Sequence, residues 1–211
     1  MENHVKKARE LAFLAHHGQK YGNRSYTTHL IDVVSLANKY NLCEITLTVA
    51  WLHDIIEDTE ITETFLRRIF GSEISSIVNK LTRKNNQNNV DYFNSIRLSS
   101  IASEVKYLDR IANLKNLKAS QTKLIEKYKS EHFFMRSLEP LIRNKQIAIE
   151  YDKLAEKTLS SIKIYHWTDQ AVLEFTKIAC GGTYGDYKNC KSLEAKLNRF
   201  KELNYISEGN D

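Results

Sequence analysis

The sequence predicts an all-α fold, and three observations support this prediction. The 211 residues include one proline and seven glycines, so residues that break helices are scarce. Apolar residues recur three and four positions apart, and no segment alternates as a strand does. Hydrophobic residues make up 42% of the chain and charged residues 27%, which is enough apolar material for one core.

The first part of the chain divides into helices separated by polar segments. Residues 3–17 have the spacing of an amphipathic helix that ends near Gly18. The polar stretch 19–28 is expected to be a loop, and a second helix to follow over 29–40. Residues 44–56 are apolar almost throughout, which predicts a central, buried helix.

Helical signals continue through the middle of the chain. Thr62 is the expected N-cap of a helix that stops at Gly71, and a short helix is expected over 73–81. The asparagine-rich stretch 83–89 predicts a solvent-exposed loop. Further helices are expected over residues 91–103, 104–118, 121–136 and 140–164.

The character of the sequence changes near His166. Thr168 is a plausible N-cap, a glycine-rich turn follows, and another short amphipathic stretch comes after it. We therefore expect a main domain over 1–160 and a small helical C-terminal extension over 165–207, whose role the sequence does not indicate.

Charge and cysteine content narrow the functional classes. The formal net charge of +5 is compatible with an anionic substrate or weak attraction to nucleic acid, and also with ordinary surface chemistry. The three cysteines, Cys43, Cys180 and Cys190, form no CxxC pair, which favours reduced thiols in a cytoplasmic protein. No signal-peptide core and no apolar run of membrane-spanning length is found, so we expect no membrane partner.

The chemistry of the chain is expected to centre on His53 and Asp54. Both lie in its most apolar segment, and buried charges need partners. Taken alone, the pair is better explained as a core histidine bonded to its neighbour. His29 and Asp109, each in another predicted helix, add a second imidazole and a second carboxylate. Four such ligands suit one divalent metal ion and leave positions open for water and phosphate.

Five stretches over about residues 8–118 carry a resemblance to a known family. In order, they are AHHGQKYGNRSYTTHLIDV, AWLHDIIEDT, RIFGSEISSIVNKLTRK, DYFNSI and VKYLDRIANLK. This combination resembles the HD superfamily of metal-dependent phosphohydrolases. Within it, the chain is similar to the hydrolase domain of the RelA/SpoT homologues and to the small alarmone hydrolases.

The resemblance implies an HD-domain helical bundle and a metal-dependent reaction. The reaction is removal of the 3′-pyrophosphate from guanosine tetra- or pentaphosphate, with Mn²⁺ or another divalent metal as cofactor. Glu57 would activate or orient the attacking water, and Asp58 would support the same water network. The implied metal ligands are His29, His53, Asp54 and Asp109.

The resemblance also implies contacts to a nucleotide substrate. Asn113 lies four residues after Asp109, on the same helix face, and matches an asparagine that contacts the nucleotide. Lys20 and Arg24 are the cationic candidates, and Tyr26 stands at an aromatic position before His29. Ordinary surface packing is an equally good explanation for these residues. Weaker candidates for a phosphate contact are Thr82, Arg83 and Lys84.

Two features of residues 16–30 add little support to the predicted site. His16 and His17 flank the end of the first helix, where capping and solvent exposure are the expected roles. Ser25 and Leu30 stand where the family usually has proline. These departures leave the ligand set intact and bear on the loop that would recognise the base.

Three alternatives to the alarmone reaction stay open. One is an HD hydrolase acting on a different nucleotide. Another is an antitoxin-like hydrolase that removes pyrophosphate from a modified tRNA 3′ end, for which phosphate contacts beyond the active site are needed. The third is an HD-fold binding protein without turnover. The oligomeric state is not indicated by the sequence.

Overall fold

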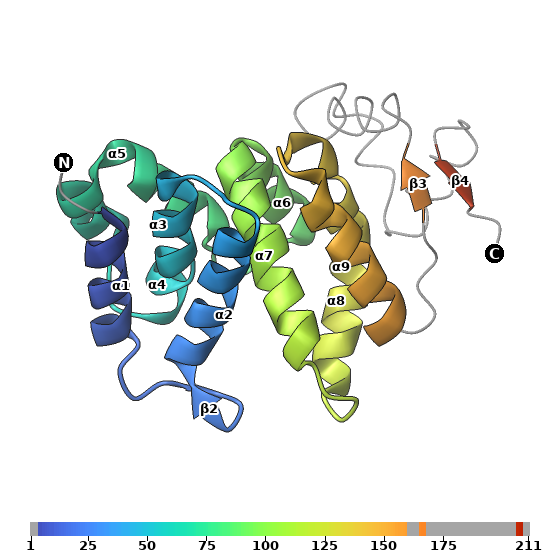
Figure 1. Ribbon diagram of the computed structural model, residues 1–211, viewed down its shortest axis with the longest axis horizontal. Helices are drawn as coiled ribbons and strands as arrows, with labels where there is room; N and C mark the ends of the chain where they lie inside the picture. The colour runs from blue at the N-terminus through green and yellow to red at the C-terminus, as the bar shows by residue number, and fades with distance from the viewer. Residues whose placement is uncertain (1–3, 160–164, 168–205, 209–211) are drawn as a thin grey trace.

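The computed structural model describes residues 4–159, 165–167 and 206–208, and the fold of this part is all-α, as predicted (Figure 1). None of the helices described is both long and apolar enough to cross a membrane. The helices are α1 (His4–Ala15), α2 (Tyr26–Lys39), α3 (Glu44–Leu52), α4 (Ile55–Asp58), α5 (Glu63–Leu81), α6 (Asn89–Arg97), α7 (Ser100–Asn116), α8 (Thr122–Arg136) and α9 (Lys145–Thr158), with a 3₁₀ turn, η1, over Glu139–Leu141.

Helix α7 occupies the middle of the bundle (Figure 1). It packs against α2, α3, α5, α6 and α9, and most of its side chains are buried. Helix α3 is also central, because it contacts α1, α2, α5 and α7. Its residues from Thr48 to Leu52 are buried, as the apolar run predicts. These two helices position three of the four candidate metal ligands.

Residues 44–56 do not form one continuous helix, contrary to our expectation. Helix α3 ends at Leu52, and His53 and Asp54 form a turn before α4. Asp54 has φ −104° and ψ −1°, in the sparsely populated region between α and β where active-site residues are often found. The break separates α3 from α4, which carries Glu57 and Asp58.

The segment before α2, expected to be a loop, contains a short β-hairpin. Strands β1 (Lys20–Tyr21) and β2 (Arg24–Ser25) pair antiparallel around the two-residue turn Gly22-Asn23. Gly22 has φ +59°, which glycine adopts without steric cost. Helix α2 consequently begins at Tyr26, one turn earlier than expected.

Capping residues mark where α5 and α7 begin. Thr62 accepts a hydrogen bond from the Phe65 backbone N–H, and Gly71 interrupts α5 with φ +83°, as predicted. The expected boundary at 103/104 is wrong. Helix α7 starts at Ser100 because Ser99 caps it, accepting from the Ala102 N–H at 3.2 Å.

Most of the expected C-terminal extension lies outside the described residues. At its two ends, β3 (Tyr165–Trp167) and β4 (Ile206–Glu208) pair antiparallel. These six residues are strands where helix or loop was expected. The division at residue 160 stays a prediction.

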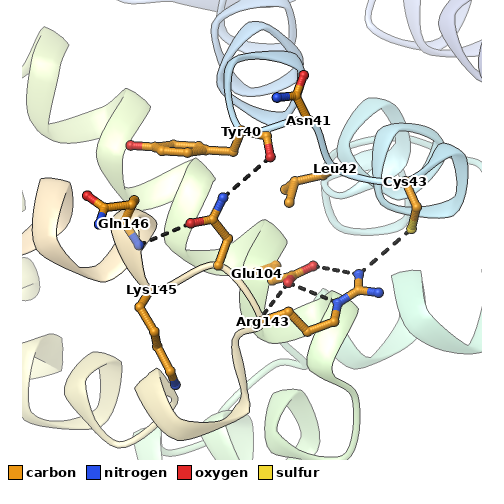
Figure 2. A pocket seen from close by; sticks show the side chains of 9 residues that line it. Tyr40, Asn41, Leu42, Cys43, Glu104, Arg143, Lys145 and Gln146 are labelled. Atoms are coloured by element: carbon orange, nitrogen blue, oxygen red, sulfur yellow. Dashed lines mark hydrogen bonds and ion pairs between the residues drawn. The ribbon is translucent and has the colours of Figure 1, made fainter.

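An open cavity of about 530 Å³ lies where the C-terminal end of α2 meets α7 and the start of α9 (Figure 2). Its polar groups bond to one another. Buried Glu104 accepts hydrogen bonds from the backbone N and the guanidinium of Arg143, at 3.0 and 2.9 Å, and Asn144 donates to the Tyr40 carbonyl. The cavity includes none of the candidate site residues. Its contacts attach the loop before α9 to the bundle.

Candidate metal centre

The four predicted metal ligands converge from three parts of the bundle. His29 lies in the first turns of α2, His53 and Asp54 form the α3–α4 turn, and Asp109 lies on α7. Ligand atoms of His29, His53 and Asp109 all lie within 4.8 Å of one another, and the three residues are buried. Asp54 Oδ2 lies 2.9 Å from His53 Nε2 and 3.7 Å from His29 Nε2.

The hydrogen bonds around His53 leave its other ring nitrogen facing oxygen atoms. Nδ1 lies 2.9 Å from the Ala50 carbonyl oxygen, so Nδ1 carries a hydrogen and Nε2 is the nitrogen that faces the carboxylates. Nε2 lies 2.9 Å from Asp54 Oδ2 and 3.9 Å from Asp109 Oδ1. Either a proton on Nε2 or a metal ion would neutralise these carboxylates, so the site suits a cation. A hydrogen bond on the far side of a ligand histidine is the usual arrangement in metal sites.

The charges around His53 also favour a bound cation. Burial alone would lower the pKa of His53, but the negative charges of Asp54 and Asp109 raise this pKa to about 9. The site is therefore strongly attractive to positive charge. Two imidazoles and two carboxylates are a donor set that fits Mn²⁺, Fe²⁺ or Zn²⁺.

Asp109 is held in place by two neighbours on its own helix. Asn113 donates to Oδ1 at 2.6 Å, and Lys106 Nζ lies 3.0 Å from Oδ2. Burial would raise the pKa of Asp109, but Lys106 and His29 hold it well below its usual value. The carboxylate is thus charged and oriented, with Oδ1 3.3 Å from His29 Nε2.

Helix α4 places Glu57 and Asp58 at the edge of this cluster. Glu57 Oε2 accepts the Arg83 backbone N–H at 2.8 Å, and Asp58 Oδ2 accepts the Tyr26 hydroxyl at 2.7 Å. Burial and the nearby charge of Asp54 raise the pKa of Glu57, although its bond to Arg83 opposes this. A raised pKa makes a carboxylate a better proton acceptor near neutral pH.

An inner cavity of about 170 Å³ joins these groups. Its walls include the cations Arg83, Lys106 and Lys127 in addition to the acidic cluster. Arg83 is anchored by Glu131, at 2.9 Å. The full lining is Tyr21, Tyr26, His29, Asp54, Glu57, Asp58, Arg83, Tyr92, Lys106, Asp109, Asn113, Lys127 and Glu131.

A larger outer cavity of about 590 Å³ adjoins the inner one, since Tyr21 and Asn113 line both. Lys20 and Arg24 line only the outer cavity, where Lys118 adds a third cation. The remaining lining residues are Gly22, Asn23, Asn116, Leu117, Gln121, Leu124 and Tyr128.

The structure therefore brings most of the predicted site residues together, in two groups. The inner cavity is lined by three of the four predicted ligands, all except His53, and by Glu57, Asp58, Tyr26 and Asn113, whereas Lys20 and Arg24 line the outer one. His53 belongs to the same ligand cluster. Among the weaker candidates, Arg83 lines the inner cavity, and Thr82 and Lys84 line neither.

Sequence reasoning missed several residues that line these cavities. Lys106 lies three positions before Asp109, so helical spacing alone could have indicated it. Tyr21 follows Lys20 directly, and its ring stacks on His29 at 4.8 Å. Glu131 is far from every motif, and no local signal marks it.

Comparison with known proteins gives relatives named as a pyrophosphohydrolase and as pyrophosphokinases. The chain is 27% identical to a guanosine-3′,5′-bis(diphosphate) 3′-pyrophosphohydrolase of Spiroplasma citri, over 93% of this chain and 31% of that protein. It is 34% identical to a GTP pyrophosphokinase of Myxococcus xanthus, over 37% of this chain and 11% of that protein. The chain thus spans a third or less of the length of these relatives.

A solved structure shares the fold. It is described as a metazoan ortholog of SpoT that hydrolyses ppGpp, and it superposes with a TM-score of 0.60 at 17% identity. The match covers 74% of this chain and 96% of that one. A model of the HD domain matches residues 8–133, which is more than half of the chain. The chain therefore belongs to the HD domain family.

Proposed function

We propose that the chain is a metal-dependent pyrophosphohydrolase that removes the 3′-pyrophosphate from guanosine tetra- or pentaphosphate, with Mn²⁺ as the metal. The observation that carries the proposal is the buried cluster of His29, His53 and Asp109, with partly buried Asp54 beside it, next to the acidic helix α4. The names of the Spiroplasma citri relative and of the metazoan structure support this substrate.

The sizes of the two cavities support a nucleotide with a terminal diphosphate. About 170 Å³ is too small for a nucleotide, because sites for molecules of that size measure roughly 300–1,000 Å³. It has room for phosphate groups. The outer cavity has room for a nucleoside, and its cations Lys20, Arg24 and Lys118 suit the 5′-phosphates. The diphosphate would then reach the metal cluster past Tyr21 and Asn113.

The reaction adds water to the phosphorus atom joined to the ribose 3′ oxygen and breaks that P–O bond. Pyrophosphate leaves, and the ribose oxygen takes up a proton to give GDP or GTP. A bound divalent cation would supply a water of lowered pKa and neutralise phosphate charge. Glu57 would take the proton from the water, and Asp58 would orient it. Lys106 would hold Asp109 in place.

The test is a panel of substrates incubated with the purified protein and Mn²⁺. Guanosine tetraphosphate is expected to yield pyrophosphate and GDP in equal amounts. Turnover of a 3′-pyrophosphorylated tRNA, without turnover of guanosine tetraphosphate, would replace the proposed substrate by a tRNA end. Repeating the assay with Mg²⁺ and Zn²⁺ tests the choice of metal.

Mn²⁺ is expected to stabilise the metal-free protein against heat. A ligand that binds only the folded state at 100 times its Kd adds about 2.7 kcal/mol to the free energy of unfolding. Differential scanning fluorimetry after EDTA treatment and dialysis would measure the shift in Tm. An unchanged Tm in Mn²⁺ would contradict the metal site and favour an HD fold without turnover.

Replacing Lys20 with alanine is expected to raise the KM for guanosine tetraphosphate roughly tenfold with little change in kcat. A hydrogen bond to a charged group contributes about 1.5 kcal/mol, and Lys20 stands in the outer cavity, away from the reacting phosphorus. Steady-state kinetics would measure this. Arg67→Ala is the control, since Arg67 is an exposed cation on α5 that pairs with Glu63, one turn away on the same helix. An equal KM in both variants would argue against a nucleotide in the outer cavity.

A further inference from the structure

The hydroxyl of Tyr26 lies between two carboxylates of the candidate centre. It is 2.5 Å from Asp54 Oδ2 and 2.7 Å from Asp58 Oδ2. The oxygen of Asp54 that it contacts is the one that faces His53 and His29. One side chain therefore connects a predicted metal ligand to the acidic helix α4.

The ring of Tyr26 is fixed by aromatic neighbours. His16 stacks on one face, with centroids 4.6 Å apart and planes 9° apart, and Tyr21 packs edge-on at 6.3 Å. His16 is fully buried, which corrects the expectation of solvent exposure. Its Nδ1 lies 2.8 Å from Gln19 Oε1, and Gln19 donates to the Asp58 carbonyl at 2.7 Å.

This packing bears on the role expected for Tyr26. A ring face covered by His16 is not available for stacking on a substrate base. The hydroxyl, by contrast, is the group that contacts the cluster. Without it, the charged carboxylates of Asp54 and Asp58 would face each other with no donor between them, and like charges at short range repel.

We propose that Tyr26 is a positioning residue, whose hydroxyl fixes Asp54 for metal binding and holds Asp58 beside it. This inference rests on the metal site of the proposed function. Groups that hydrogen-bond to metal ligands orient them, and their loss typically reduces metal affinity 10- to 100-fold. Tyr26 acts through the two aspartates and needs no contact with the nucleotide.

The experiment is calorimetric titration of Mn²⁺ into metal-free Tyr26→Phe, which keeps the ring and removes the hydroxyl. The Kd is expected to rise 10- to 100-fold. Tyr40→Phe is the matched control, because it also removes a tyrosine–carboxylate hydrogen bond, to Glu150, at the opposite end of α2, roughly 20 Å away. The Mn²⁺ affinity of the control should equal that of the wild type.

A second measurement separates positioning from a general loss of structure. Asp58→Asn removes one of the two charges, so adding Tyr26→Phe in that background should weaken Mn²⁺ binding less than in the wild type. Equal effects in both backgrounds, or Tyr26→Phe binding Mn²⁺ as tightly as the wild type, would overturn the inference. Failure of the wild type to bind Mn²⁺ would overturn the metal site and this inference with it.

Discussion

Replacing Asp54 with asparagine is expected to reduce the turnover of guanosine tetraphosphate by a factor of about 10³ or more. Asparagine keeps the size of the side chain and removes its charge, so the cluster loses one of two carboxylates. Stabilisation of transition-state charge by a metal contributes several kcal/mol, and each 1.36 kcal/mol is a factor of ten in rate. Release of pyrophosphate at saturating substrate and Mn²⁺ would measure the loss.

Folding of the Asp54 variant should be preserved, which makes the activity result interpretable. Asp54 is only partly buried, and its attraction to His53 outweighs its repulsion with Asp109, so its charge contributes to the stability of the metal-free fold. Urea denaturation of the metal-free protein should give one cooperative transition with a stability somewhat below that of the wild type. Activity within tenfold of wild type in a folded variant would show that Asp54 is not a ligand.

Replacing Glu131 with alanine is expected to lower the free energy of unfolding by about 3–5 kcal/mol. Glu131 forms ion pairs with Arg110 and Arg83, and both Glu131 and Arg110 are almost fully buried. Loss of one partner leaves the buried guanidinium of Arg110 without a carboxylate, a large penalty in a low-dielectric interior. Since domains are stable by about 5–15 kcal/mol, the variant would lose a large share of its free energy of unfolding.

Urea denaturation followed by circular dichroism would measure this loss. Glu126→Ala is the control, because Glu126 lies on the same helix and pairs with Lys129 in solvent, where such pairs contribute about 0–1 kcal/mol. Combining Glu131→Leu with Arg110→Met should recover much of the stability, since apolar residues can replace a buried ion pair. A Glu131→Ala variant no weaker than Glu126→Ala would contradict this account.

The sequence was sufficient to predict the elements that depend on local pattern. Thr62 and Gly71 delimit helices as expected, because capping and positive φ are properties of single residues. The convergence of His53 with Asp109 was also predicted, since two polar groups in apolar helices need partners.

Features that depend on contacts between distant segments were not predictable in this way. The turn at Asp54 interrupts an apolar run with no glycine or proline to mark it. Tyr26 faces Asp58 across 32 positions, and Arg110 faces Glu131 across 21. Such pairs follow from how the helices pack, so the hydroxyl of Tyr26 and the anchor of Arg83 emerged only from the structure.

Helix α7 fixes the distance between the metal cluster and the outer cavity. Asp109 faces the histidines, Asn113 lines both cavities, and Asn116 lines the outer one. With a rise of 1.5 Å per residue, the seven positions from Asp109 to Asn116 span roughly 10 Å. A rigid helix keeps this length constant, so a ligand that reaches from the metal cluster to the outer cavity is selected for its length as well as its charge.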